Sequence, residues 1–170
     1  MRKNYKKNFL ILGLGNEILK DDGVGIFAVR SLKDRVGKNV DLEESSESGL
    51  TLLDIILPYK RVLIIDSIRK EEKEPGTIYE FDLKDLSVSP SPSPHYLGLP
   101  LSLLLAKKLN LKTPETIKIL AVEIGHPIKM GEGLSPGIKK VIPTLIKRAV
   151  EIINEWKERE KNKEKLEVIY

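Results

Sequence analysis

Apolar runs and helical repeats alternate along the first half of the chain. The run NFLILGL over residues 8–14 is almost continuously apolar and ends at a glycine turn, which is typical of a strand buried on both faces. Apolar positions at helical spacing follow over 21–36, and VDLEES over 40–45 indicates a shorter strand. Residues 48–59 form a helical pattern that stops before a proline, and RVLIIDSI over 61–68 repeats the character of the first strand. This βαβαβ order predicts parallel strands with right-handed crossovers.

The alternation changes after residue 68. TIYEFDL over 77–83 alternates as a strand does, but the link that precedes it is too short for a crossover helix, so we predict an antiparallel strand. Residues 87–94 are rich in proline and serine. Because they lead directly into a helical pattern over 99–110, we expect them to form an ordered loop. TIKILAVEI over 116–124 is predicted to be a fifth, buried strand.

The last helical pattern covers residues 135–159. Ser135 is a suitable N-cap residue and is followed by a proline at the first helical position. Pro143 lies inside the pattern and should kink the helix or split it. We expect the charged tail after about residue 157 to fray. With no internal repeat, the pattern predicts a single domain over residues 1–170.

Composition narrows the range of partners. The 170 residues, 41% of them hydrophobic, suffice for one domain with its own core. The net charge is only +4, and the basic residues are scattered or interleaved with acids, which argues against a nucleic-acid surface. The absence of cysteine excludes disulfides, thiolate metal sites and cysteine nucleophiles. The apolar run after the basic start is too short for a signal peptide, and no segment is long enough to span a membrane. We therefore expect a cytoplasmic protein that binds neither membrane nor nucleic acid.

The glycine turn after the first strand has two of the three glycines of a dinucleotide-binding fingerprint. Gly13 and Gly15 match the pattern G-x-G-x-x-G, but Ile18 stands where the third glycine would pack helix against strand. Asp21 and Asp22 then open the following helix, where a pyrophosphate would lie, and their charges oppose phosphate binding. A Rossmann-type nucleotide-binding oxidoreductase is thus an alternative, not the main hypothesis.

Acidic and histidine side chains fall near strand ends, where open parallel sheets bind their ligands. Asp22 follows the first strand and Asp66 ends the third, so parallel strands would bring both to one edge. If the loop that carries His95 folds over this edge, two oxygen ligands and one imidazole can converge as in a reactive metal site. Each residue also has a structural explanation: Asp22 as a helix cap, Asp66 as the residue that orders its loop, and His95 as an exposed loop residue. His126 follows the fifth strand and could equally enter the site.

Four motifs together resemble a known family, the maturation proteases of nickel-iron hydrogenases. These motifs are GLGNEILKDDGVG over 13–25, VLIIDSI over 62–68, SPHYLGL over 93–99 and GLSPGI over 133–138. They occur in the family's order and span nearly the whole chain. The resemblance implies an α/β fold, a three-layer α/β/α sandwich whose twisted five-stranded sheet is mostly parallel with one antiparallel strand.

The resemblance also implies an activity. Members of this family are endopeptidases that remove a C-terminal extension from the hydrogenase large-subunit precursor after nickel insertion. The family's metal-contacting residues map onto Asp22, Asp66 and His95. The precursor would supply the nickel, so no organic cofactor is expected, and a monomer would suffice. Nickel could act as a Lewis acid on the scissile carbonyl or on water, or a carboxylate such as Asp22 could be the general base.

Substrate contacts are expected at the turns around these residues. We assign them to Gly13, Gly15 and Asn16 in the first turn, and to Gly49 and Glu47 in the turn before the second helix. That second turn reads ESSESG, where the family often has a Gly/Thr-rich sequence, and Glu47 adds a charge there. A chaperone that holds the nickel-loaded subunit without cutting it is the non-enzymatic alternative.

Overall fold

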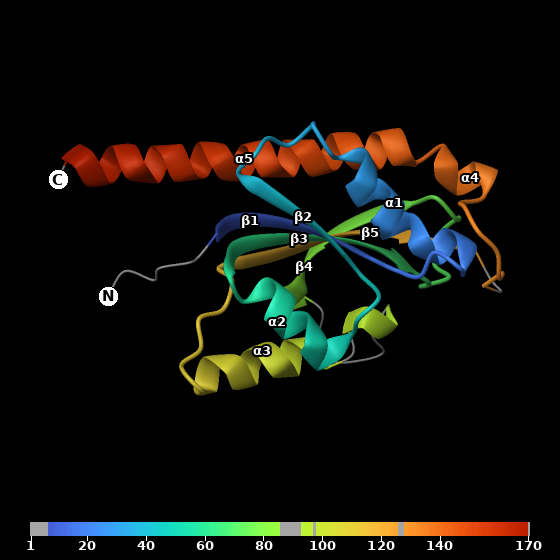
Figure 1. The fold of residues 1–170 in the computed structure, drawn as a ribbon, viewed down its shortest axis with the longest axis horizontal. Helices are drawn as coiled ribbons and strands as arrows, with labels where there is room; N and C mark the ends of the chain where they lie inside the picture. The colour runs from blue at the N-terminus through green and yellow to red at the C-terminus, as the bar shows by residue number, and fades with distance from the viewer. Residues whose placement is uncertain (1–6, 86–92, 97, 126–127, 170) are drawn as a thin grey trace.

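Five strands form one sheet in the order β2-β1-β3-β5-β4 (Figure 1). The computed structural model describes residues 7–85, 93–96, 98–125 and 128–169. Strands β1, β2, β3 and β5 are mutually parallel, and β4 pairs antiparallel with β5 at the edge, as its short link predicts. The strands are β1 Lys7–Leu14, β2 Val40–Ser45, β3 Tyr59–Ile68, β4 Ile78–Asp82 and β5 Thr116–Glu123.

Helices cover both faces of the sheet and complete the predicted three-layer α/β/α sandwich (Figure 1). One face is covered by the long helix α5 together with α1 and α4, and the other by α2 and α3. Within the described ranges, no helix combines the length and hydropathy needed to cross a bilayer. The helices are α1 Val24–Ser31, α2 Leu52–Ile56, α3 Leu99–Lys108, α4 Pro136–Lys139 and α5 Ile142–Ile169.

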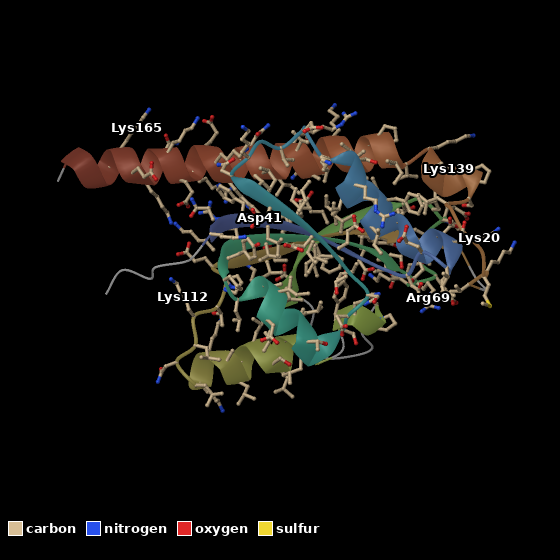
Figure 2. All side chains as sticks on the ribbon, viewed as in Figure 1. Lys20, Asp41, Arg69, Lys112, Lys139 and Lys165 are labelled. Carbon is tan, nitrogen blue, oxygen red and sulfur yellow. The ribbon has the colours of Figure 1, made fainter. Side chains whose placement is uncertain are left out.

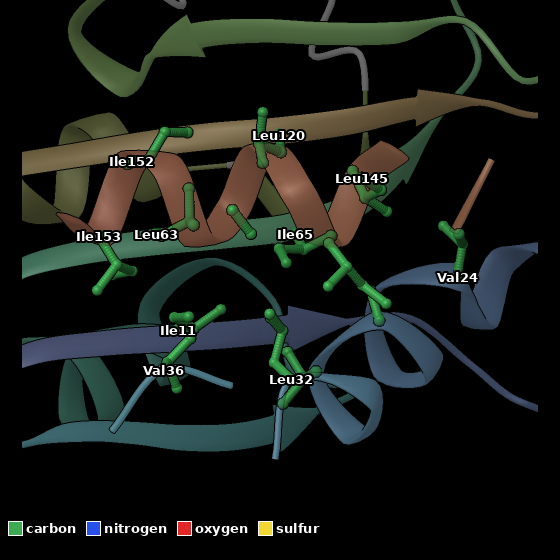
Figure 3. Close-up of a cluster of buried hydrophobic side chains, with 14 of the residues drawn as sticks. Ile11, Val24, Leu32, Val36, Leu63, Ile65, Leu120, Leu145, Ile152 and Ile153 are labelled. Carbon is green, nitrogen blue, oxygen red and sulfur yellow. The ribbon is translucent and has the colours of Figure 1, made fainter. Parts of the chain in front are cut away.

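Alternate residues of the central strands fill two separate cores. Ile11 and Leu63 point toward α5, where Ile152 and Ile153 pack against the sheet (Figure 3). Their neighbours in the strands point to the other face and pack with α2 and α3. Each such side chain stabilises the fold by roughly 1.5–3 kcal/mol when fully buried. This double burial explains why the strands are continuously apolar.

The first helical segment is shorter than the pattern predicts. A 3-10 turn, Lys20–Gly23, precedes α1, and the helix ends at Ser31 and not near residue 36. Asp34 has a φ of 67°, a left-handed conformation that a helix cannot continue through. The second predicted helix is likewise divided into a 3-10 turn, Gly49–Thr51, and α2.

The C-terminal helix is split as Pro143 predicts. Helix α4 ends at Lys139, and Pro143 is the second residue of α5, where its missing N–H costs no hydrogen bond. Past residue 157, where the charge pattern led us to expect fraying, α5 continues to Ile169. The buried Arg61 accounts for part of this extension, since it donates to the Trp156 carbonyl (3.0 Å) and forms an ion pair with Glu160 (2.6 Å).

A charged cluster joins the edge strand β4 to α5. Both carboxylate oxygens of Glu80 accept hydrogen bonds from Arg148, at 2.7 and 2.9 Å, and one also accepts from Lys118. These bonds, led by Arg148, lower the pKa of Glu80 to about 2. A depressed carboxyl pKa stabilises the fold above the unfolded value and loses that effect as pH falls toward 2.

The Glu80→Gln variant should therefore be less stable than wild type at pH 7 by about 1 kcal/mol, because the cluster is partly solvated. The difference should shrink as pH falls from about 5 to 2. Urea unfolding at several pH values measures it. A difference independent of pH would contradict the electrostatic origin.

Candidate active site

The three residues singled out in the sequence lie at the carboxyl ends of β1 and β3. Asp22 is in the 3-10 turn after β1, Asp66 is two residues before the end of β3, and His95 is in a 3-10 turn, Pro94–Tyr96. Strands β2 and β3 pair with opposite edges of β1, so this position is a topological switch point, where doubly wound sheets bind ligands.

Asp66 is completely buried and held in place by two neighbours. One carboxylate oxygen accepts the Ser67 backbone N–H at 2.8 Å, and the other accepts the Ser93 hydroxyl at 2.8 Å. Burial raises the pKa of Asp66 to about 6, although the nearby His95 and the hydrogen bonds counteract part of the rise. The buried carboxyl group therefore holds a proton more tightly than an exposed aspartate does.

The His95 ring is oriented by a main-chain contact. Its Nδ1 lies 2.9 Å from the carbonyl oxygen of Glu47. Because a carbonyl can only accept, Nδ1 must carry the hydrogen, and the neutral ring then leaves a lone pair on Nε2. Nε2 lies 3.9 Å from Oδ1 of Asp66, and the side chain is only 12% exposed. The imidazole nitrogen that can bind an ion or accept a proton thus faces the carboxylate.

Ser67 links the two carboxylates across the end of β3. Successive strand residues point to opposite faces, so Asp66 points toward the α2–α3 side and Ser67 toward the α1–α5 side. The Ser67 N–H binds Asp66, while its hydroxyl donates to Oδ1 of Asp22 at 2.9 Å. The other Asp22 oxygen accepts the Asn16 backbone N–H at 3.0 Å. Asp22, Asp66 and His95 therefore belong to one polar network.

The network contains the kinds of side chain that bind metal ions, but the three side chains do not surround a common point. Two carboxylates and an imidazole suit divalent transition metals such as nickel. In the part of the chain that the structure describes, however, no three His, Asp or Glu side chains are arranged to surround an ion. Asp66 and His95 face each other directly, whereas Asp22 reaches them only through Ser67. An incoming ion would have to draw these ligands together.

The structure separates Asp22 from its neighbour Asp21. The Asp21 carboxylate accepts the Ser135 backbone N–H at 2.6 Å and so caps α4. Ser135 is the N-cap residue, as predicted, but its side chain makes no capping bond. The sequence did not indicate whether Asp21 or Asp22 faces the candidate site. In the structure Asp21 is bonded to Ser135, and Asp22 is the acid that is bonded to Ser67 in the polar network. His126 and most of the proline–serine loop over 87–94 lie outside the described residues.

The glycines of the first turn let three backbone segments approach closely. A Cβ atom on Gly13 would lie 2.4 Å from the Gly25 carbonyl oxygen, and one on Gly15 would lie 2.0 Å from that of Asp22. This packing explains Gly13 and Gly15 without a substrate, so their predicted substrate contacts stay predictions. The backbone N–H of Asn16 donates to the Asp22 carboxylate, so Asn16 also has a structural role and its predicted substrate contact stays a prediction.

The turn before α2 also has a structural role. Gly49 is buried with a φ of 57°, a left-handed conformation that glycine adopts without strain, and it begins the 3-10 turn that leads into α2. The side chain of Glu47 is exposed, and only its carbonyl oxygen contacts His95. Predicted substrate contacts of Gly49 and of the Glu47 side chain therefore stay predictions.

Sequence reasoning missed three residues that support the site. Ser67 and Ser93 hold the carboxylates, and Tyr96 is buried next to Asp66. Burial and the Asp66 charge raise the pKa of Tyr96 well above its usual value, although its hydroxyl reaches no partner among the described residues at normal hydrogen-bond geometry. All three lie within two residues of Asp66 or His95 in the sequence, and this proximity could have identified them.

Ser67→Ala should slow substrate turnover about tenfold, a typical effect of losing a hydrogen bond that orients a ligand. The change removes the donor to Asp22 but keeps the N–H that binds Asp66. Ser31→Ala is a matched control. Ser31 is the last residue of α1, away from the site, and its hydroxyl donates to the Phe27 carbonyl. Equal turnover by the two variants would show that the Ser67–Asp22 bond has no functional role.

The fold and the site define an α/β protein whose switch point presents carboxylates and an imidazole in place of a phosphate-binding loop. A family profile described as "Hydrogenase maturation protease" matches residues 26–152. The chain belongs to the hydrogenase maturation protease family and is accordingly a hydrolase that processes protein, as its resemblance to that family implies. The matched range contains Asp66 and His95 and begins four residues after Asp22.

Known hydrogenase maturation proteases resemble this chain in sequence and in fold. A putative hydrogenase maturation protease of Methanocaldococcus jannaschii is 31% identical over 153 residues, which cover 87% of this chain and 95% of the relative. The Hydrogenase 2 maturation protease of Escherichia coli is 26% identical, with coverage of 86% and 90%. The solved hydrogenase maturating endopeptidase HybD from E. coli superposes with a TM-score of 0.74 at 24% identity, with coverage of 88% and 93%.

Proposed function

We propose that this chain is an endopeptidase that removes the C-terminal extension of a nickel-iron hydrogenase large-subunit precursor after nickel insertion. The observation that carries the proposal is the polar network of Asp22, Asp66 and His95 at the switch point, in a chain of the maturation protease family. In this proposal the nickel ion arrives with the substrate. Among similar proteins, one from Thermococcus kodakarensis is described as a [NiFe] hydrogenase maturation protease.

The proposed recognition explains why the network is not a closed cage. Asp22 and Asp66 offer carboxylate oxygens, and the Nε2 lone pair of His95 completes a set that nickel accepts. A precursor without nickel lacks the ion that would draw the three side chains together. Recognition of the ion and commitment to cleavage would then be the same event.

Two chemical roles for the network follow from its geometry. The ion can polarise the scissile carbonyl or the attacking water while the three side chains hold it. Alternatively, a carboxylate can take the proton from water, and the raised pKa of Asp66 suits that exchange near neutral pH.

Mass spectrometry of the precursor tests the proposal. A nickel-loaded precursor incubated with the chain should lose the mass of its C-terminal extension, whereas the nickel-free precursor should keep it. A nickel-loaded precursor that binds but keeps its full mass would support the chaperone alternative instead. The oxidoreductase alternative predicts dinucleotide binding, which the acidic pair in the 3-10 turn before α1 opposes.

A further inference from the structure

Helix α3 leaves three of its leucines exposed, whereas two of its three buried residues are small. Leu99, Ser102 and Ala106 face the sheet and are buried. Leu101, Leu104 and Leu105 face outward with exposed fractions of 69%, 51% and 51%. A helix that covers a core normally buries most of its large apolar side chains. The arrangement indicates that the outer face of α3 has a second partner.

Six exposed leucines lie on α3 or in the segments next to it, and we call this set the α3 leucine face. Nine large apolar side chains are exposed among the described residues, and six of them lie on or beside this helix. Monomers rarely expose apolar patches larger than a few hundred Å², and such patches usually bind other molecules. Figure 1 shows α3 as the outermost element on its side of the sheet, opposite α5. The α3 leucine face consists of Leu50, Leu101, Leu104, Leu105, Leu109 and Leu111.

This surface is continuous with the candidate active site. Helix α3 begins four residues after His95, and Gly98 makes the turn between them with a φ of 76°. Leu50 lies three residues after Glu47, whose carbonyl orients the His95 ring. The 3-10 turn of Leu50 also packs beside both α3 and the turn of His95. A polypeptide held at His95 would therefore lie next to these leucines.

We infer that the α3 leucine face is the docking surface for the protein substrate of the proposed function, on which this inference rests. The occupant is an apolar face of the hydrogenase precursor. Lys107 and Lys108 are exposed in the last turn of α3, and residues 99–112 contain no acid, so an acidic margin on the partner would complement this end of the helix. A second copy of this chain is disfavoured, because it would cover the same edge that a protein substrate must approach.

Binding of the nickel-free precursor tests this inference separately from cleavage. The Leu101→Lys/Leu104→Lys double variant should bind that precursor roughly tenfold more weakly than wild type in calorimetric titrations. Leu166→Lys is the matched control, since Leu166 is 60% exposed near the far end of α5 and should bind as wild type does. The substituted side chains are solvent-exposed, so thermal melting of all three proteins should agree.

Kinetics provide a second readout. With the nickel-loaded precursor, the double variant should raise KM about tenfold and leave kcat unchanged. A wild-type chain that binds the nickel-free precursor but does not cut the nickel-loaded one would overturn the proposed function while supporting the docking surface.

Three results would overturn the docking surface itself. The first is equal precursor affinity of wild type and the double variant, and the second is no binding of the nickel-free precursor by wild type. The third is a wild-type dimer, seen by analytical ultracentrifugation, that the double variant converts to monomer, since the leucines would then join two copies.

Discussion

His95→Ala and Asp66→Asn are each expected to slow cleavage of the nickel-loaded precursor by about 10²- to 10⁴-fold. The first removes the Nε2 lone pair that faces Asp66. The second removes a buried charge and keeps one oxygen that can accept the Ser67 N–H, while the new amide N–H group can donate to the Ser93 hydroxyl oxygen. The loss is expected whether the network binds nickel or exchanges a proton. Mass spectrometry of the precursor at timed intervals measures it.

Neither variant should fail to fold. Burial raises the pKa of Asp66, which means that the fold disfavours its ionised form, so a neutral amide should not weaken the protein. Asp41→Asn is a suitable control. Asp41 is also a strand carboxylate, bonded to the Tyr59 hydroxyl, but it lies near the amino end of β2, away from the site (Figure 2). Wild-type rates in both site variants would remove Asp66 and His95 from the catalytic machinery.

Gly25→Ala is expected to lower the free energy of unfolding by about 3 kcal/mol. The added Cβ would lie 2.1 Å from the Ile65 carbonyl oxygen and 2.4 Å from that of Leu14, and both are backbone atoms of central strands that cannot move aside. Helix α1 would have to shift, and with it the turn that carries Asp22. Urea unfolding measures the loss.

Gly137→Ala provides the comparison. It lies within α4, and an added Cβ would meet no atom within 4 Å. Alanine is favoured over glycine in helices, so stability should stay equal or rise slightly. If the two variants unfold at the same urea concentration, the close packing of α1 on β1 and β3 is not what requires glycine at position 25.

The sheet was predictable because its strands are buried on both faces. The apolar runs that become β1, β3 and β5 need no tertiary information to be recognised, and the short link before β4 fixes its antiparallel direction. Helix ends were less predictable. The end of α1 depends on the left-handed backbone at Asp34, and the persistence of α5 depends on Arg61, which lies far away in the sequence.

The sequence predicted which sheet edge carries the site, but it did not predict the hydrogen bonds within the site. Parallel strands bring Asp22 and Asp66 to one edge, a consequence of topology that the sequence pattern contains. The choice between Asp21 and Asp22 required α4, because only the folded chain places the Ser135 N–H next to Asp21. The role of Ser67 as a link depends on strand alternation at a position where the pattern gave no reason to look for a polar contact.

The contact between the Glu47 carbonyl and His95 also bears on how this turn can diverge among relatives. A main-chain oxygen is present whatever residue occupies position 47, so the His95 ring keeps its tautomer even when the sequence of the turn changes. Substitution there is free to alter the charge at the rim without disturbing the imidazole. The orientation of the His95 ring therefore does not depend on which side chain the turn presents at position 47.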